Sequence, residues 1–129
     1  MRWEVRAPWP SIEEIERRFD ELIRSRWGTQ ISAPPADVFV VDDEVWVEVD
    51  LPGVRRTDVQ VRLVDDRLVI EGTRTRIVPT SRARPAHRER NPGSFRRALL
   101  LPVGFEEAEV EVSLRAGVLR ARVRRRVVR

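Results

Sequence analysis

His87 is the only histidine in the chain, and it could act as a general base or a metal ligand because imidazole titrates near neutral pH. The nearest hydroxyl belongs to Ser94, and the intervening chain, if extended, spans roughly 20 Å. Ser94 also lacks the G-x-S-x-G context of a strained nucleophile turn. No second histidine and no cysteine could complete a metal site. The sequence therefore predicts no enzyme, no cofactor and no metal ligand.

Arginine offers a second possible chemistry, because the chain has no lysine and all 25 of its basic residues are arginines. A strip of arginines around the histidine could hold phosphates, with Phe95 as a stacking platform for a base. The strip consists of Arg82, Arg84, Arg88, Arg90, Arg96 and Arg97. Glu89 interrupts it, and Phe95 alternates with Arg96 as an inward-facing core residue would. An arginine-rich nucleic-acid-binding protein is therefore an alternative, and no specific nucleic acid is expected as a partner.

The charge is divided into opposite blocks along the chain, although the net charge is only +4. Residues 37–73 carry four arginines against ten acidic residues, and residues 74–129 carry fifteen arginines against five. A nucleic-acid binder usually presents a basic face without an equally strong acidic block beside it. Opposite blocks can instead attract each other within or between subunits. The distribution therefore favours self-association.

From Asp37 onward, apolar residues recur at every second position, which is typical of strands. We therefore expect strands to position the residues named above. Paired aspartates at 42–43 and 65–66 and the Pro52-Gly53 step are typical of turns that join antiparallel strands. About seven strands fit into some 90 residues, which predicts an all-β, immunoglobulin-like antiparallel β-sandwich. The residues expected to face its core include Val45, Val47, Val49, Leu51, Val59, Val61 and Leu63.

An amphipathic helix is expected before the strands, starting after Ser11 and ending near Gly28. Ser11 and Glu14 have the spacing of a capping box. The helix is followed by a proline-rich linker, which separates it from the sandwich. We therefore expect an N-terminal arm at 1–35, a sandwich at 36–125 and a very short C-terminal tail at 126–129.

The N-terminus has no apolar run of signal-peptide length, and no segment has the 18 or so apolar residues of a membrane span. The absence of cysteine fits a reducing compartment. The expectation is a soluble, cytoplasmic protein with no membrane span.

Several blocks, in order, resemble the small heat-shock proteins, whose shared core is the α-crystallin domain. The segment ERNPGSFRRALLLP, residues 89–102, is similar to the family pattern E-R-x-x-G-x-F-x-R-x-x-x-L-P. The segment VSLRAGVLRARV is similar to A-x-x-x-n-G-V-L, with Val112 and Ala116 in place of the usual alanine and asparagine. PPADVFVVDDEVWVEVDLPGV and RRFDEL add further matches.

The resemblance implies an ATP-independent holdase of the bacterial type, which binds unfolding proteins through apolar surfaces under stress. A co-chaperone adaptor on the same sandwich is a second alternative. Unfolding clients and a second copy of the chain are the expected partners, with ATP-dependent refolding chaperones as further ones. The expected client-binding residues form the apolar side of the arm: Trp3, Trp9, Ile12, Ile15, Phe19, Leu22, Ile23 and Trp27.

The resemblance also implies a homodimer, in which a strand at 86–91 adds to the partner's edge strand at 37–41. Arg97 lies either near this boundary or on the outer face of the sandwich. The expected interface residues are Asp37, Phe39, Val41, His87, Arg88, Glu89, Arg90 and Arg97.

The C-terminal residues depart from the family pattern. Family tails carry I-x-I or V-x-V, which docks between two edge strands of a neighbour, whereas Val127 and Val128 are adjacent here. Large shells built by tail docking are therefore put in doubt, and the size of any larger oligomer is open. The groove between 59–64 and 110–115 either stands open to clients or is filled by an N-terminal segment such as Trp3-Glu4-Val5.

Overall fold

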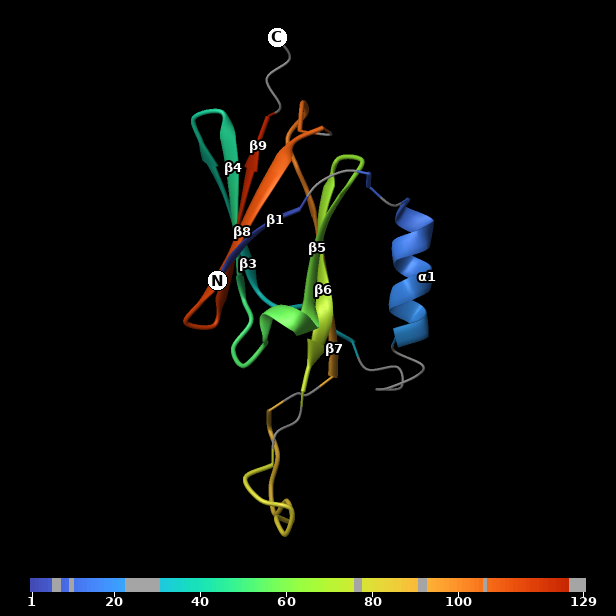
Figure 1. The fold of residues 1–129 in the computed structure, drawn as a ribbon, viewed down its shortest axis with the longest axis vertical. Helices are drawn as coiled ribbons and strands as arrows, with labels where there is room; N and C mark the ends of the chain where they lie inside the picture. Colours follow the sequence, from blue (N-terminus) through green and yellow to red (C-terminus); the bar gives the residue numbers. More distant parts are fainter. Residues whose placement is uncertain are drawn as a thin grey trace.

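Two mostly antiparallel β-sheets pack face to face, with a helix on the outer side of one of them (Figure 1). The computed structural model describes residues 1–5, 8–9, 11–22, 31–75, 78–90, 93–105 and 107–125. Within 36–125 these residues form seven strands, β3 to β9. The predicted immunoglobulin-like β-sandwich with an N-terminal helix is confirmed.

The first sheet has five strands in the order β1-β8-β9-β4-β3. All its neighbouring strands are antiparallel. Their bounds are β1 Arg2–Val5, β3 Ala36–Val41, β4 Glu44–Asp50, β8 Glu109–Arg115 and β9 Val118–Arg124. The N-terminal strand β1 is therefore part of the sandwich, at the edge of the first sheet.

The second sheet has four strands in the order β2-β7-β6-β5. Their bounds are β2 Ile31–Ser32, β5 Val59–Val64, β6 Arg67–Arg74 and β7 Gly93–Leu100. The short β2 pairs with β7 in parallel, and a 3-10 turn, η2 (Arg56–Asp58), leads into β5.

The alternating apolar residues meet between the sheets, as the period of two predicts. Burial of these branched side chains supplies the main driving force of the fold. The seven residues expected to face the core are each at most 3% exposed: Val45, Val47, Val49, Leu51, Val59, Val61 and Leu63. Phe95 on β7 is 1% exposed, which confirms that it faces inward and is not a stacking platform.

The predicted turns join the strands as expected. Asp42 and Asp65 adopt left-handed backbone angles, with φ of 54° and 53°, in the β3–β4 and β5–β6 hairpins. Aspartate tolerates this conformation better than most residues, which explains its use in two-residue hairpin turns. Gly53, with φ of 78°, occupies the turn position that requires a positive φ.

Helix α1 (Ile12–Leu22) begins where the capping pattern predicts. The backbone N–H of Glu14 donates to Ser11 Oγ at 3.2 Å, and the N–H of Ile15 donates to the Ser11 carbonyl. The helix lies against the outer face of the four-stranded sheet (Figure 1). The expected end near Gly28 lies outside the described residues.

The long connection between β6 and β7 projects away from the sandwich (Figure 1). Its described residues, 78–90, contain turns and bends and no strand, and residue 91 of the expected strand at 86–91 lies outside the described part. The strand expected there needs the edge of a partner chain to pair with.

Candidate functional site

The N-terminal strand fills the groove between β8 and β5. It continues the five-stranded sheet past β8, with Trp3 opposite Val112 and Val5 opposite Val110. The Leu114 N–H donates to the Met1 carbonyl at 2.9 Å, which extends the ladder to the first residue. Of the two possibilities for this groove, the structure therefore has the filled one, with Trp3-Glu4-Val5 as the occupant.

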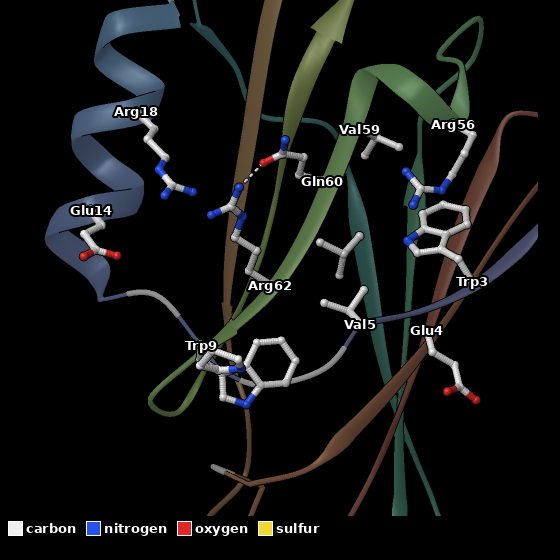
Figure 2. Close-up of a pocket in the computed structure, with 12 residues that line it drawn as sticks. Trp3, Glu4, Val5, Trp9, Glu14, Arg18, Arg56, Val59, Gln60 and Arg62 are labelled. Carbon is white, nitrogen blue, oxygen red and sulfur yellow. Dashed lines mark hydrogen bonds between the residues drawn. The ribbon is translucent and has the colours of Figure 1, made fainter.

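Alternation along β1 decides which side chains enter the groove. Trp3 and Val5 are half-buried and pack against the core, whereas Glu4 between them is exposed. Figure 2 shows Trp3 and Val5 directed toward Val59 of β5. Both side chains thus stay only half-buried, and β1 contributes just four residues. Such a short strand can be displaced more easily than the strands beneath it.

A pocket of about 660 Å³ remains between β1, α1 and β5. The Arg56 guanidinium lies 4.0 Å from the centroid of the Trp3 ring, close enough for a cation–π contact (Figure 2). Arg62 donates to Gln60 on the same strand. The lining residues are Trp3, Glu4, Val5, Pro8, Trp9, Glu14, Arg18, Arg56, Val59, Gln60, Val61 and Arg62. The pocket thus combines two tryptophans and three valines with charges of both signs.

The expected client-binding residues fall into three groups. Trp3 and Trp9 line this pocket, and Ile12 and Ile15 pack against the outer face of the four-stranded sheet. Ile15 is fully buried there. Phe19 and Leu22 belong to α1, but their side chains lie outside the described part, as do Ile23 and Trp27 entirely.

The opposite edge of the five-stranded sheet is uncovered. Val38, Phe39, Val40 and Val41 of β3 are 43%, 47%, 70% and 38% exposed. Asp37, at the start of this strand, is also exposed. Unpaired backbone groups beside a run of apolar side chains make an edge that readily pairs with another strand.

The loop residues expected at a dimer interface are exposed at a distance from this edge. His87, Arg88, Glu89 and Arg90 are exposed, and His87 Nε2 lies 3.2 Å from Glu89 Oε2. Because the loop projects from the sandwich, it does not lie along β3 of its own chain (Figure 1). The structure of one chain therefore does not bring together the two halves of the expected interface.

Arg97 is not on the outer face of the sandwich. It pairs with Ile70 on β6 and shares the inward side of β7 with Phe95. Consecutive residues of a strand point to opposite faces, and accordingly Arg97 is half-buried whereas the next residue, Ala98, is exposed. Of the two positions considered for Arg97, the register of β7 does not support the outer face, because it turns Arg96, and not Arg97, outward.

A network of charged residues lies on the outer face of the sheet beside β3. Trp46 Nε1 donates to Glu44 at 2.7 Å, and Arg122 and Arg124 approach the same carboxylate at 3.0 and 3.1 Å. The hydrogen bond from Trp46 and those from Arg122 hold the pKa of Glu44 below its ordinary value. This network gave no signal in the sequence, because its members come from strands far apart along the chain.

One edge of this β-sandwich is thus covered by an extended segment of its own chain, and the other edge is bare and apolar. The chain belongs to the Hsp20/alpha crystallin family, whose model matches residues 37–129. Members of this family are ATP-independent chaperones without enzymatic activity, and that is the function of this chain. Family members bind unfolded clients and assemble with themselves.

Known proteins support this membership over most of the chain. Spore protein SP21 of Stigmatella aurantiaca is 36% identical, over 86% of this chain and 71% of that protein. Heat shock protein 16.0 from Schizosaccharomyces pombe superposes with a TM-score of 0.62 at 27% identity, over 76% of this chain and 94% of that one. The hspA protein from Xanthomonas axonopodis gives 0.61 at 28% identity, over 74% and 95%. These relatives do not favour the adaptor or the nucleic-acid alternative.

No helix in the described ranges is long and apolar enough to cross a membrane.

Proposed function

We propose that this chaperone captures unfolding clients with the apolar side of its N-terminal arm. The supporting observation is that few apolar contacts hold the helix of the arm: Ile15, which is 0% exposed, and Ile12 pack against Val64 and Val69, and the described helix has 11 residues. An isolated helix of this length is marginal in water. The proposed capture residues are Trp3, Trp9, Ile12, Ile15, Phe19, Leu22, Ile23 and Trp27.

Release of the arm would offer an apolar surface without a fixed shape. Burial of apolar area contributes about 25 cal/mol per Å², whatever the sequence that covers it. Tryptophan adds a large, rigid contact surface at low entropic cost. A surface of this kind suits clients that share only exposed apolar segments.

The capture role can be tested by light scattering from a heat-labile test protein, held at its aggregation temperature with equimolar subunits and no nucleotide. The chain without residues 1–30 should remain folded and should lose most of the suppression given by the full chain. An inert protein of similar charge serves as the control. Full suppression by the truncated chain would show that the arm is not the main binding site.

We propose further that the working unit is a homodimer joined at β3. The bare β3 edge favours this arrangement because it lies beside exposed apolar side chains, which a partner strand would cover. The partner's loop would bring Arg88 and Arg90 toward the acidic segment 37–50, which favours a rapid and oriented encounter. The proposed contact residues are Asp37, Phe39, Val41, His87, Arg88, Glu89, Arg90 and Arg97.

The remaining proposals concern organisation and setting. The chain divides into an arm at 1–35, a sandwich at 36–125 and a tail at 126–129, with β1 of the arm docked onto the sandwich. It acts in the cytoplasm and passes its clients to ATP-dependent refolding chaperones. Recovery of client activity only after such chaperones and ATP are added would support this transfer, and unaided recovery would argue against it.

A further inference from the structure

Glu71 is a charged residue buried beneath helix α1. It lies on the outer face of β6, yet it is only 5% exposed. Its cross-strand neighbours are Gln60 on β5 and Arg96 on β7. Its Oε2 accepts no hydrogen bond from any residue that the structure describes. A carboxylate in such a place is costly unless other charges compensate it.

Arginines from all three surrounding elements face this carboxylate. Arg62 comes from β5, Arg96 from β7 and Arg18 from α1. The helix also supplies Glu16, whose Oε1 lies 3.9 Å from Arg96 Nη2. Burial raises the pKa of Glu71, and the three guanidinium groups oppose that effect without cancelling it. The ionised carboxylate is therefore less favourable under the helix than in water.

The apolar contact that holds the helix is small. Ile15 and the half-buried Ile12 pack against Val64 and Val69, which project from the same outer face as Glu71. Docking of α1 thus buries a few branched side chains and, with them, one incompletely compensated negative charge. The first effect favours docking and the second opposes it.

We propose that the outer face of the four-stranded sheet is a releasable seat for α1, in which Glu71 weakens the contact and Arg18 limits that weakening. The inference rests on the proposed function, because α1 carries capture residues. Glu71 thus destabilises the docked helix. As a result, the helix can be released under mild stress, before the sandwich itself unfolds.

The direction of the pH dependence follows from the same contact. The pKa of Glu71 is higher in the docked state than in the released state, where water surrounds the carboxyl group. Docking therefore takes up protons. It is strongest at a pH below the ordinary glutamate pKa, and it weakens as the pH rises through the raised value.

The seat can be probed with a thiol, because the chain contains no cysteine. Val69, beneath α1, is 0% exposed, so alkylation of the thiol introduced by Val69→Cys reports helix release in the full-length chain. Val47 lies in the core and is also 0% exposed, so Val47→Cys reports global unfolding. The first thiol should react much faster than the second.

Two variants in the Val69→Cys background should act in opposite directions. Glu71→Gln should slow the alkylation by about threefold or more, since it removes the buried charge, and Arg18→Gln should accelerate it by a similar factor. Arg84→Gln, an exposed arginine in the loop that projects from the sandwich, is the matched control and should leave the rate unchanged. The ratio of the parent rate to the Glu71→Gln rate should approach one as the pH falls, because both side chains are then neutral. Faster alkylation in Glu71→Gln, or equal rates in all variants, would overturn the proposal.

The chaperone assay separates this inference from the function on which it rests. Glu71→Gln should suppress aggregation less than the parent chain at the same temperature, and Arg18→Gln should suppress it more. If the parent chain suppresses aggregation and the two variants match it, the releasable seat is wrong and the function stands. If the parent chain itself gives no suppression, the proposed function fails, whatever the alkylation rates are.

Discussion

At one edge of the five-stranded sheet, β8 is covered by β1 of its own chain, whereas at the other edge β3 leaves four consecutive apolar residues exposed. Both edges offer unpaired backbone groups, so both would invite pairing with foreign strands if left open. The chain supplies a cover for the first edge from its own N-terminus. The second edge then becomes the natural place for another subunit, and the covered edge shows what such a cover looks like: an extended segment with apolar side chains at every second position.

The largest effect should come from damage to the hydrophobic core, on which the five-stranded sheet and both of its edges depend. Phe95→Ala removes a ring that is 1% exposed, and it should reduce the free energy of unfolding by about 3–5 kcal/mol. Urea denaturation followed by circular dichroism measures this loss. An unchanged midpoint would mean that Phe95 is not part of the core.

A charge placed on the bare β3 edge tests whether this edge binds a second chain. Val40→Glu places a charge at the most exposed position of β3, which is 70% exposed, so the fold should tolerate it. The dimer should weaken by about tenfold or more, because the charge would be desolvated against the partner strand. Sedimentation velocity over a range of concentrations measures the change.

Val103→Glu is the matched control for this prediction. Val103 is 88% exposed, but it lies in the connection between β7 and β8, away from the β3 edge. It should leave the dimer intact. If both variants dimerise as the parent chain does, β3 is not the interface.

The covered edge should open when its anchor is removed. Trp3→Ala removes the ring that Arg56 stacks on and that packs against the core, so β1 should leave β8 more often. Amide hydrogen exchange in the 109–115 strand should accelerate by about tenfold, while the strands of the other sheet are unaffected. Arg2→Ala, at an exposed position of the same strand, should change little. Equal exchange in both variants would show that Trp3 does not hold β1.

The smallest effect concerns the hairpin next to the covered edge. Ala116 has φ of 51° in the turn between β8 and β9, a conformation that alanine adopts with strain and asparagine tolerates. Ala116→Asn should therefore stabilise the chain by about 0.5–1 kcal/mol, since it restores an Asn-Gly turn. A shift of the thermal midpoint to a higher temperature would agree, and a lower midpoint would contradict this explanation.

Local patterns were enough to predict the sandwich. Alternating valines give strands, and aspartate pairs followed by charged residues give turns, because each signal depends on residues close together in the chain. The N-terminal helix was predicted from its stripe and its Ser11 cap for the same reason. The match to the family motif at Gly93 and Phe95 agrees with the predicted sandwich, but it does not state which side chains face the core.

The contacts that surround the candidate site depend on distant segments, and the sequence could not give them. The four residues of β1 are too few for a periodic signal, and they pair with a strand more than a hundred residues away. Glu71 alternates with the inward-facing Ile70, as an exposed residue would, but it is buried on the face that helix α1 covers. The sequence could not decide whether Arg97 lies near the dimer boundary or on the outer face of the sandwich, because the motif does not state which side chains of this strand face outward.

The helix is connected at both ends to parts of the sandwich. Six residues separate β1 from α1, and eight separate α1 from β2. Eight residues span at most roughly 28 Å, so a released helix stays close to its seat and returns by an intramolecular step. Its rebinding does not depend on protein concentration and needs no energy source. A chaperone built in this way would reset itself when the client leaves, which fits a mechanism without ATP.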